Sequence, residues 1–314
     1  MRPSKSNRKI RRQIIPIKCK AWWKKYRFTL IITLISLAAG SIAITLTKQP
    51  LTKCGESELF LYVLDVGQGD AALLYSPDTA VLIDGGEYDN GERILDLLHA
   101  LGIQRLDAVI NSHPHSDHLG GLCTVLNEIP TDVVYLPRYP EELTPTGFLF
   151  EQFLETAEEK TLRLTTPVSG QSVSVGSLGL TFYQANLDTY EDLNDCSLVC
   201  RITHGDQSFL FTGDISKEAE HALIRDGYTE QANFLKCPHH GSGNSASDEF
   251  LGVVSPDFVS ISAGTFNDYG HPAQACLKRL LSHTNEIYRT DLDGTILFIS
   301  DGTSIRPQTH ISFD

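Results

Sequence analysis

Four side chains that can bind a metal ion lie within six residues of this chain, in the segment Asn111-Ser-His-Pro-His-Ser-Asp-His-Leu-Gly-Gly. They are His113, His115, Asp117 and His118. The apolar run just before them, LDAVIN (106–111), is typical of a short buried strand. Histidines two residues apart at a strand end point the same way, and an Asp-His pair at the start of a following helix can face a neighbouring position. The segment therefore predicts a metal site where a strand gives way to a helix.

The ligand types suggest the chemistry of this site. Three imidazoles suit Zn, Mn or Fe, and the carboxylate adds a hard oxygen ligand. A metal-bound water at such a site ionises near neutral pH and can attack a carbonyl or a phosphorus atom. The alternative is a polar loop that carries three histidines by chance, which the preceding strand and the following Gly-Gly argue against. The sequence has no G-x-S-x-G elbow and no phosphate-binding Gly-Lys loop, so we expect a metal-dependent hydrolase without a nucleotide cofactor.

Charge divides the chain into a basic head and an acidic body. Residues 1–49 hold 12 Lys and Arg and no acidic residue, which leaves 14 basic against 39 acidic residues, a net charge of −25, in the remainder. Phe28 to Leu46 runs 19 residues without a charge, long enough to cross ~30 Å of hydrocarbon as a helix. The excess of basic residues before this run favours a cytoplasmic N-terminus. We expect a single-pass cell-membrane protein with an extracytoplasmic body, or a secreted protein if the helix is a cleaved signal peptide.

The body alternates strand-like and helix-like segments. Apolar runs such as LFLYVLDV (59–66) and SFLFTGD (208–214) predict strands, and the periodic segments 92–102 and 148–159 predict helices. Two groups of strands, each followed by helices, favour an α/β fold of two packed sheets with helices outside, in four layers. Seven cysteines without a C-x-x-C pair leave room for a disulfide, which their spacing does not assign. The expected parts are a basic cytoplasmic segment (1–27), a transmembrane helix or signal peptide (28–46), a linker (47–57) and one hydrolase domain (58–314).

The H-x-H-x-D-H pattern resembles the signature of the metallo-β-lactamase fold. More narrowly, the body resembles the extracytoplasmic hydrolase domain of ComEC-type competence proteins. The stretches that carry this resemblance occur in the family's order: LDVGQGDA (64–71), LIDGG (82–86), SHPHSDHLGG (112–121), FLFTGD (209–214), LKCPHHGS (235–242) and YGHP (269–272). The resemblance implies a four-layer αββα sandwich and a centre of one or two divalent metal ions, Zn or Mn.

The resemblance also implies roles for further residues. Asp214 matches a carboxylate that bridges two metals, and either His239 or His240 supplies the last ligand, with His240 favoured because the family's late ligand often precedes a Gly. His271 is expected to hydrogen-bond a substrate oxygen or to protonate a leaving group. Asp65, Gln68, Asp70 and Asp84 lie on loops expected near the site, where Asp84 can orient a ligating histidine through its free ring nitrogen.

One departure concerns the first metal position. Typical metallo-β-lactamases supply a third histidine between the H-x-H-x-D-H motif and the bridging Asp, and here the matching region reads Asn194-Asp-Cys-Ser. ComEC-type domains look similar in this respect. Either Asp195 or Asn194 takes that place, or the first position binds metal weakly and prefers Mn over Zn.

Taken together, these features predict a metal-dependent hydrolase that acts outside the membrane on phosphodiester bonds. A metal-bound hydroxide is expected to attack, with Asp117 at the catalytic centre. The resemblance implies either nuclease-type cleavage of DNA or removal of phosphorylcholine from cell-surface polymers. The acidic body offers no long basic track for a nucleic acid. The alternative is a non-catalytic metal- or DNA-binding module of degenerate hydrolase fold, which the missing third histidine favours.

Overall fold

The computed structural model describes residues 49–190 and 192–313. The expected transmembrane helix over 28–46 and the basic segment before it lie outside the described residues. Within 49–190 and 192–313, no helix has the length and the apolar composition that a membrane crossing requires. The expected layout of residues 1–57 therefore stays a prediction.

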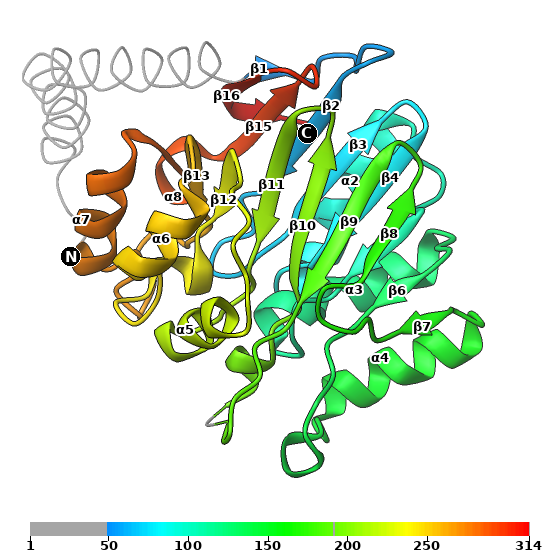
Figure 1. Cartoon of the computed structure of the whole chain (residues 1–314). Helices are drawn as coiled ribbons and strands as arrows, with labels where there is room; N and C mark the ends of the chain where they lie inside the picture. The colour runs from blue at the N-terminus through cyan, green and yellow to red at the C-terminus, as the bar shows by residue number, and fades with distance from the viewer. Residues whose placement is uncertain (1–48, 191, 314) are drawn as a thin grey trace, which may run out of the picture. The chain divides into compact units, whose positions relative to one another are not determined.

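Two β-sheets form the centre of the described body (Figure 1). In the described residues the first sheet has the strand order β1 (Gln49–Pro50), β16 (Ile305–Ser312), β15 (Thr295–Ser300), β2 (Leu59–Val63), β3 (Ala72–Ser76), β4 (Thr79–Ile83), β5 (Ala108–Ile110), β6 (Val134–Tyr135) and β7 (Leu164–Thr165). The second has the order β14 (Glu286–Arg289), β13 (Phe258–Ile261), β12 (Phe234–Lys236), β11 (Gln207–Phe211), β10 (Val199–His204), β9 (Leu178–Tyr183) and β8 (Ser172–Val175).

Helices cover the outer face of each sheet. The first sheet packs against α2 (Gly91–Leu101), α3 (Ser116–Glu128) and α4 (Phe148–Glu159). The second packs against α5 (Lys217–Arg225), α6 (Asp248–Val254) and α7 (Gln274–His283), and the short α8 (Thr290–Asp293) precedes β15 (Figure 1). The layers follow the order helix, sheet, sheet, helix, which confirms the expected α/β sandwich.

Strand β2 shows why the sheets are buried on both faces. Its side chains alternate in direction. Phe60 and Tyr62 pack with the helices of the outer layer, whereas Leu61 and Val63 pack into the core between the two sheets. All four are at most 1% exposed, and burying one such side chain stabilises the fold by about 1.5–3 kcal/mol. A continuous apolar run is therefore the expected sequence of such a strand.

The helices begin and end at residues that suit those positions. Helix α2 buries Ile94, Leu97 and Leu98 along one face. It ends at Gly102, whose left-handed backbone (φ 74°) is costly for other residues. Helix α6 begins after Ser247, whose hydroxyl accepts a hydrogen bond from the backbone N–H of Phe250. Local sequence thus sets the helix ends, while the apolar faces attach the helices to the sheets.

Candidate metal centre

The candidate site lies where the carboxyl ends of strands from both sheets meet. In the first sheet β4 and β5 are parallel, and Asp84 and the histidine motif follow them directly. In the second sheet β11 and β12 are parallel, and Asp214 and His240 follow them within a few residues. Parallel strands end at the same edge of a sheet, so the topology gathers these side chains although they are far apart in sequence.

Asp214 is the carboxylate at the middle of the centre. Its Oδ1 lies 3.4 Å from His118 Nε2, and its Oδ2 lies 3.2 Å from His240 Nε2. His240 Nε2 is also 3.2 Å from Asp117 Oδ2. Asp214, His118 and His240 are all at most 3% exposed. The structure therefore brings together four residues that the sequence pointed to, three of them buried and Asp117 partly exposed.

In both central histidines, His118 and His240, the ring nitrogen Nδ1 lies next to a hydrogen-bond acceptor. Asp84 Oδ2 lies 2.9 Å from His118 Nδ1, and Asp84 is itself fixed by the backbone N–H (2.7 Å) and the hydroxyl (2.7 Å) of Ser112. His240 Nδ1 lies 3.1 Å from the carbonyl oxygen of Ser262 and 3.4 Å from Asp70 Oδ1. Acceptors at Nδ1 leave Nε2 of each ring free to act as a ligand, which is the usual arrangement around protein metal sites.

Among residues 49–190 and 192–313, four buried atoms at this centre find no hydrogen-bond partner: Asp70 Oδ1, His118 Nε2, Asp214 Oδ1 and His240 Nε2. The same four residues each offer a ligand atom within 4.8 Å of the others. Buried polar atoms nearly always have partners, so a cluster of unpaired ones indicates that something else binds there. Imidazole nitrogens and carboxylate oxygens are ligands of divalent transition metals. The residues therefore fit a divalent metal ion.

The electrostatics of the cluster also favour positive charge at its middle. Burial by itself would lower the pKa of His118 and His240. Asp214, together with Asp84 for His118 and Asp70 for His240, instead raises the pKa of each well above its ordinary value. Burial would raise the pKa of Asp214, but His240 and His118 hold it well below its usual range. The carboxylates thus stabilise a cation at the place where the two imidazoles meet.

His113 and His115 form the other half of the motif. His113 Nε2 lies 3.2 Å from His115 Nδ1, and the ring centroids of His113 and His118 are 4.1 Å apart. Burial, followed by the charge of His118, lowers the pKa of His113 well below its ordinary value. A histidine must be neutral to bind a metal, so His113 is in the state that ligation requires.

His239 and His271 border the centre on its solvent side. His239 Nε2 is 3.8 Å from Asp214 Oδ2, but its side chain is 29% exposed against 2% for His240. The His271 ring lies 5.6 Å from the His239 ring and 6.4 Å from the His240 ring. Burial and these two imidazoles lower the pKa of His271 to about 4. The geometry favours His240 as a ligand and leaves His239 and His271 facing the space above the centre.

Three other residues that the sequence suggested make their hydrogen bonds elsewhere. Asp195 Oδ1 accepts a hydrogen bond from the backbone N–H of Ser216 (2.9 Å), and Asp65 Oδ1 accepts one from the N–H of Gly67 (3.3 Å). The backbone carbonyl of Asn194 accepts from Ser197 Oγ (2.6 Å). In the described part of the chain, neither Asp195 nor Asp65 nor Asn194 makes a hydrogen bond or ion pair with the clustered histidines. A ligand or supporting role for them stays a prediction.

Ser197 and Lys236 were missed by the sequence reasoning, and Asp70 was not given a role. Ser197 Oγ accepts the backbone N–H of Asp214 (3.1 Å), so it holds Asp214 from the region where a third histidine was expected. Lys236 Nζ lies 2.7 Å from Asp70 Oδ2 in the protein interior. A lysine inside the apolar strand NFLKC was the available signal, because a buried charge needs a partner.

The backbone around the motif is packed tightly by small residues. A Cβ on Gly121 would lie 2.2 Å from the carbonyl oxygen of Gly85, and helix α3 therefore approaches the loop of Asp84 closely. This close approach positions His118, on α3, against the Asp84 carboxylate. The Gly-Gly that ends the motif has a packing reason, since a larger residue would push the helix away from the loop.

The sequence model of the metallo-beta-lactamase superfamily matches the chain over residues 64–259. The chain belongs to this superfamily. Within it, the chain is 30% identical to ComE operon protein 3 of Bacillus subtilis (strain 168) over 267 residues, which cover 78% of this chain and 33% of that protein. It is 31% identical to Competence protein ComA of Neisseria gonorrhoeae over 245 residues, 77% of this chain and 32% of that protein.

The chain thus spans about a third of the length of these curated relatives. The solved metallo-beta-lactamase fold protein YhfI from Bacillus subtilis superposes with a TM-score of 0.55 at 16% identity, covering 77% of this chain and 100% of that chain. At this identity the likeness shows the fold. The superfamily and the competence-protein relatives confirm the resemblance seen in the sequence motifs.

Proposed function

We propose that this metallo-beta-lactamase superfamily member is a divalent-metal phosphodiesterase of nuclease type that acts on DNA outside the membrane. The observation that carries the proposal is the buried cluster of Asp70, His118, Asp214 and His240, with its unpaired ligand atoms. The relatives named as competence proteins support DNA as the substrate. The uncharged run over 28–46 supports a single-pass anchor or a cleaved signal peptide.

The residues divide into two neighbouring groups around Asp214. On one side Asp117, His118 and His240 converge, with Asp70 behind His240. His113 and His115 form the second group, with the His113 ring next to that of His118. A divalent ion such as Zn or Mn held by these donors would supply Lewis acidity and lower the pKa of a coordinated water. Ser112 and Asp84 keep the donors in place through the hydrogen bonds already described.

Two residues are placed to handle protons and charge on the substrate. Asp117 keeps 24% of its side chain exposed beside the buried centre. Burial would raise its pKa, but the neighbouring imidazoles of His240 and His118 lower it, so the carboxylate is ionised at neutral pH. It can accept the proton of the attacking water. His271, neutral at this pH, can donate a ring N–H to a phosphoryl oxygen.

The test is turnover by the full-length protein in mild detergent, with Mn or Zn added separately. The substrates are bis-p-nitrophenyl phosphate, single-stranded DNA and p-nitrophenylphosphorylcholine. We expect metal-dependent cleavage of the first two. The variant His240→Ala should lose at least about 100-fold in rate, as expected when a donor of a metal site is removed. His99→Ala, on the exposed side of α2, should match the parent.

The outcomes separate the competing functions. Cleavage of the phosphorylcholine ester but not of DNA would replace the nuclease assignment with an esterase. A folded, metal-loaded protein that cleaves none of the three would favour a non-catalytic metal- or DNA-binding module.

A further inference from the structure

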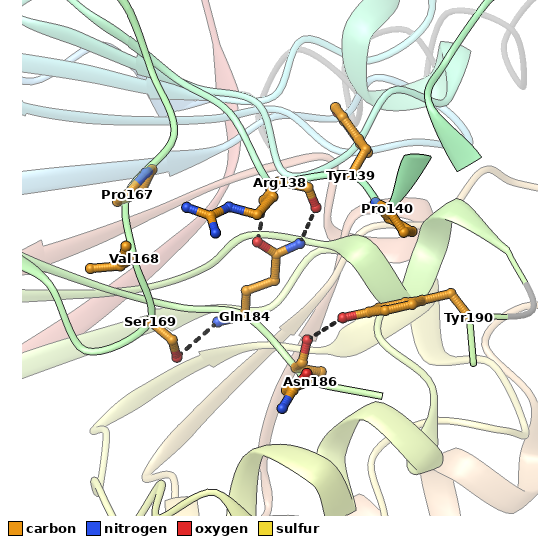
Figure 2. A pocket seen from close by; sticks show the side chains of 10 residues that line it. Arg138, Tyr139, Pro140, Pro167, Val168, Ser169, Gln184, Asn186 and Tyr190 are labelled. Carbon is orange, nitrogen blue, oxygen red and sulfur yellow. Dashed lines mark hydrogen bonds between the residues drawn. The ribbon is translucent and has the colours of Figure 1, made fainter. Parts of the chain in front are cut away.

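A pocket of about 310 Å³ lies among three segments that follow strands of the two sheets. Figure 2 shows the side chains that line it. Its walls come from the segment after β6, the segment after β7 and the loop after β9. The residues that line it include Arg138, Pro140, Val168, Gln184 and Tyr190. Its volume falls in the range of about 300–1,000 Å³ that is typical of ligand sites.

Strand register places this pocket beside the histidine motif. Strands β5 and β6 are parallel, with Ile110 next to Tyr135. His113 lies three residues after Ile110, and Arg138 lies three residues after Tyr135. The two segments therefore begin at the same edge of the sheet, on adjacent strands about 4.8 Å apart. The backbone N–H of Leu198, just before β10 of the second sheet, donates to the carbonyl of Ser112, which follows β5 of the first sheet (2.8 Å). The segment that carries the histidine motif and the segment that carries one wall of the pocket therefore leave the first sheet side by side.

Gln184 fixes the floor of the pocket. Its Oε1 accepts the backbone N–H of Arg138 (3.0 Å), and its Nε2 donates to the carbonyls of Arg138 (2.6 Å) and Cys196 (2.9 Å). These bonds connect the end of β6 in one sheet to the segment before β10 in the other. The side chain of Gln184 thus ties the wall after β6 to the loop after β9, and the pocket is formed before any ligand arrives.

Arg138 brings an available positive charge to the pocket. Its backbone is held by Gln184, whereas its side chain is exposed and its guanidinium makes no ion pair within the described residues. Figure 2 shows this side chain extending toward Pro167 and Val168. The body outside the first 49 residues carries a net charge of −25, so an anionic substrate needs a local cation to approach it. An arginine suits a phosphate because its planar fork can donate two hydrogen bonds.

The remaining wall offers flat and apolar surface. The ring of Tyr190 is held by a hydrogen bond from its hydroxyl to the carbonyl of Ala185 (2.7 Å), and Figure 2 shows it on the far side of Gln184 from Val168. Val168 is 55% exposed, although it is apolar. Aromatic rings and apolar side chains of this kind bind the faces of unpaired bases, whatever their sequence.

We propose that this pocket binds the nucleotide next to the scissile phosphodiester of single-stranded DNA, with Arg138 on its phosphate and Tyr190 and Val168 against its base. This inference rests on the proposed function. It adds a binding subsite that selects a polymeric, single-stranded substrate over a small diester, because a small diester reaches only the metal centre.

The test compares Arg138→Ala with Lys278→Ala, a matched loss of one positive charge at an exposed position on α7. For oligo-dT, Arg138→Ala should raise KM about tenfold, the effect of one charge-assisted contact, with kcat within about twofold. Its kcat/KM on bis-p-nitrophenyl phosphate should not change. Tyr190→Ala should also raise KM for oligo-dT, because base stacking is lost. Lys278→Ala should change the kinetics of neither substrate.

A second readout keeps this inference separate from the proposed hydrolase function. Fluorescence anisotropy measures the binding of a labelled oligo-dT of five nucleotides to the full-length protein. EDTA is present, so that no turnover takes place. We expect about tenfold weaker binding by Arg138→Ala. Equal losses on both substrates, or unchanged binding of oligo-dT, would overturn the subsite while leaving the hydrolase assignment standing. Weakened binding without any turnover of the parent would keep the subsite and remove the hydrolase.

Discussion

Lys236 Nζ lies 2.7 Å from Asp70 Oδ2, with the two side chains 4% and 8% exposed. Lys236 ends strand β12, just before the turn that carries His239 and His240, and Asp70 also lies 3.4 Å from His240 Nδ1. Burial would lower the pKa of Lys236, but Asp70 raises it, so the lysine is charged in the folded protein. This buried ion pair joins the loop before β3 to the turn that supplies a candidate metal ligand.

Breaking this pair on one side should be strongly destabilising. Lys236→Met leaves the Asp70 carboxylate buried without its partner, which costs about 3–5 kcal/mol. Urea unfolding in EDTA measures this loss without a metal contribution. The double variant Asp70→Asn with Lys236→Met should regain much of the stability, since no charge is then stranded. A loss below about 1 kcal/mol in Lys236→Met would contradict the role given to the pair.

Asp84 should control metal affinity without being a ligand. Asp84→Asn removes the acceptor that faces His118 Nδ1 and should weaken metal binding about 10- to 100-fold. Asparagine tolerates the left-handed backbone of this position (φ 54°), so the variant is expected to fold. Calorimetric titration with Zn measures the affinity. Asp65→Asn, the same change in a carboxylate that holds a turn, serves as the control, and equal losses in the two variants would refute the prediction.

Glu220 should make the stability of the protein depend on pH. Its carboxylate accepts the backbone N–H groups of Ala246 (2.5 Å) and Ser247 (2.8 Å), and burial raises its pKa to about 7 from 4.5. Between pH 4.5 and 7 the folded protein keeps a proton that the unfolded chain has lost. The free energy of unfolding should therefore fall as pH rises through this window, by up to about 3 kcal/mol.

Denaturant unfolding in EDTA across this pH range measures the effect. Glu220→Gln cannot titrate and should lose this slope. Glu218→Gln, on the exposed side of the same helix, should keep it. The assignment fails if the slope survives in Glu220→Gln.

Cys237 and Cys276 should form a disulfide under oxidising conditions. Their Sγ atoms are 3.9 Å apart, and both side chains are buried. Reaction with oxidised glutathione would join the two sulfurs, and the two electrons and two protons would reduce one glutathione disulfide to two thiols. The bond would close a loop between residues 39 apart in the sequence and should stabilise the fold by about 4 kcal/mol. Peptide mapping without reductant detects the link, and the buried Cys123 should remain a free thiol throughout.

Much of the fold could be predicted because its signals are local. The periodic apolar residues of 92–102 and 148–159 predicted α2 and α4 to within a residue at each end, because one face of each helix packs on a sheet. The strand 59–66 was predicted too long, since the chain leaves the sheet after Val63 to form the loop that carries Asp70. A sequence pattern marks apolar residues, and it does not mark where hydrogen bonding to a neighbouring strand stops.

The sequence by itself determined the motif from His113 to His118, because four potential ligands within six residues after a buried strand are far more typical of a metal site than of an ordinary polar loop. It also pointed to Asp214 and to the His239-His240 pair through short motifs. Only the tertiary structure decided which atoms meet. His240 rather than His239 is buried against Asp214, and Asp84 faces Nδ1 of His118. Asp195 accepts a hydrogen bond from Ser216. The same holds for Asp70 with Lys236. These contacts join segments far apart along the chain, and they exist because the parallel strands of two sheets end at one shared edge.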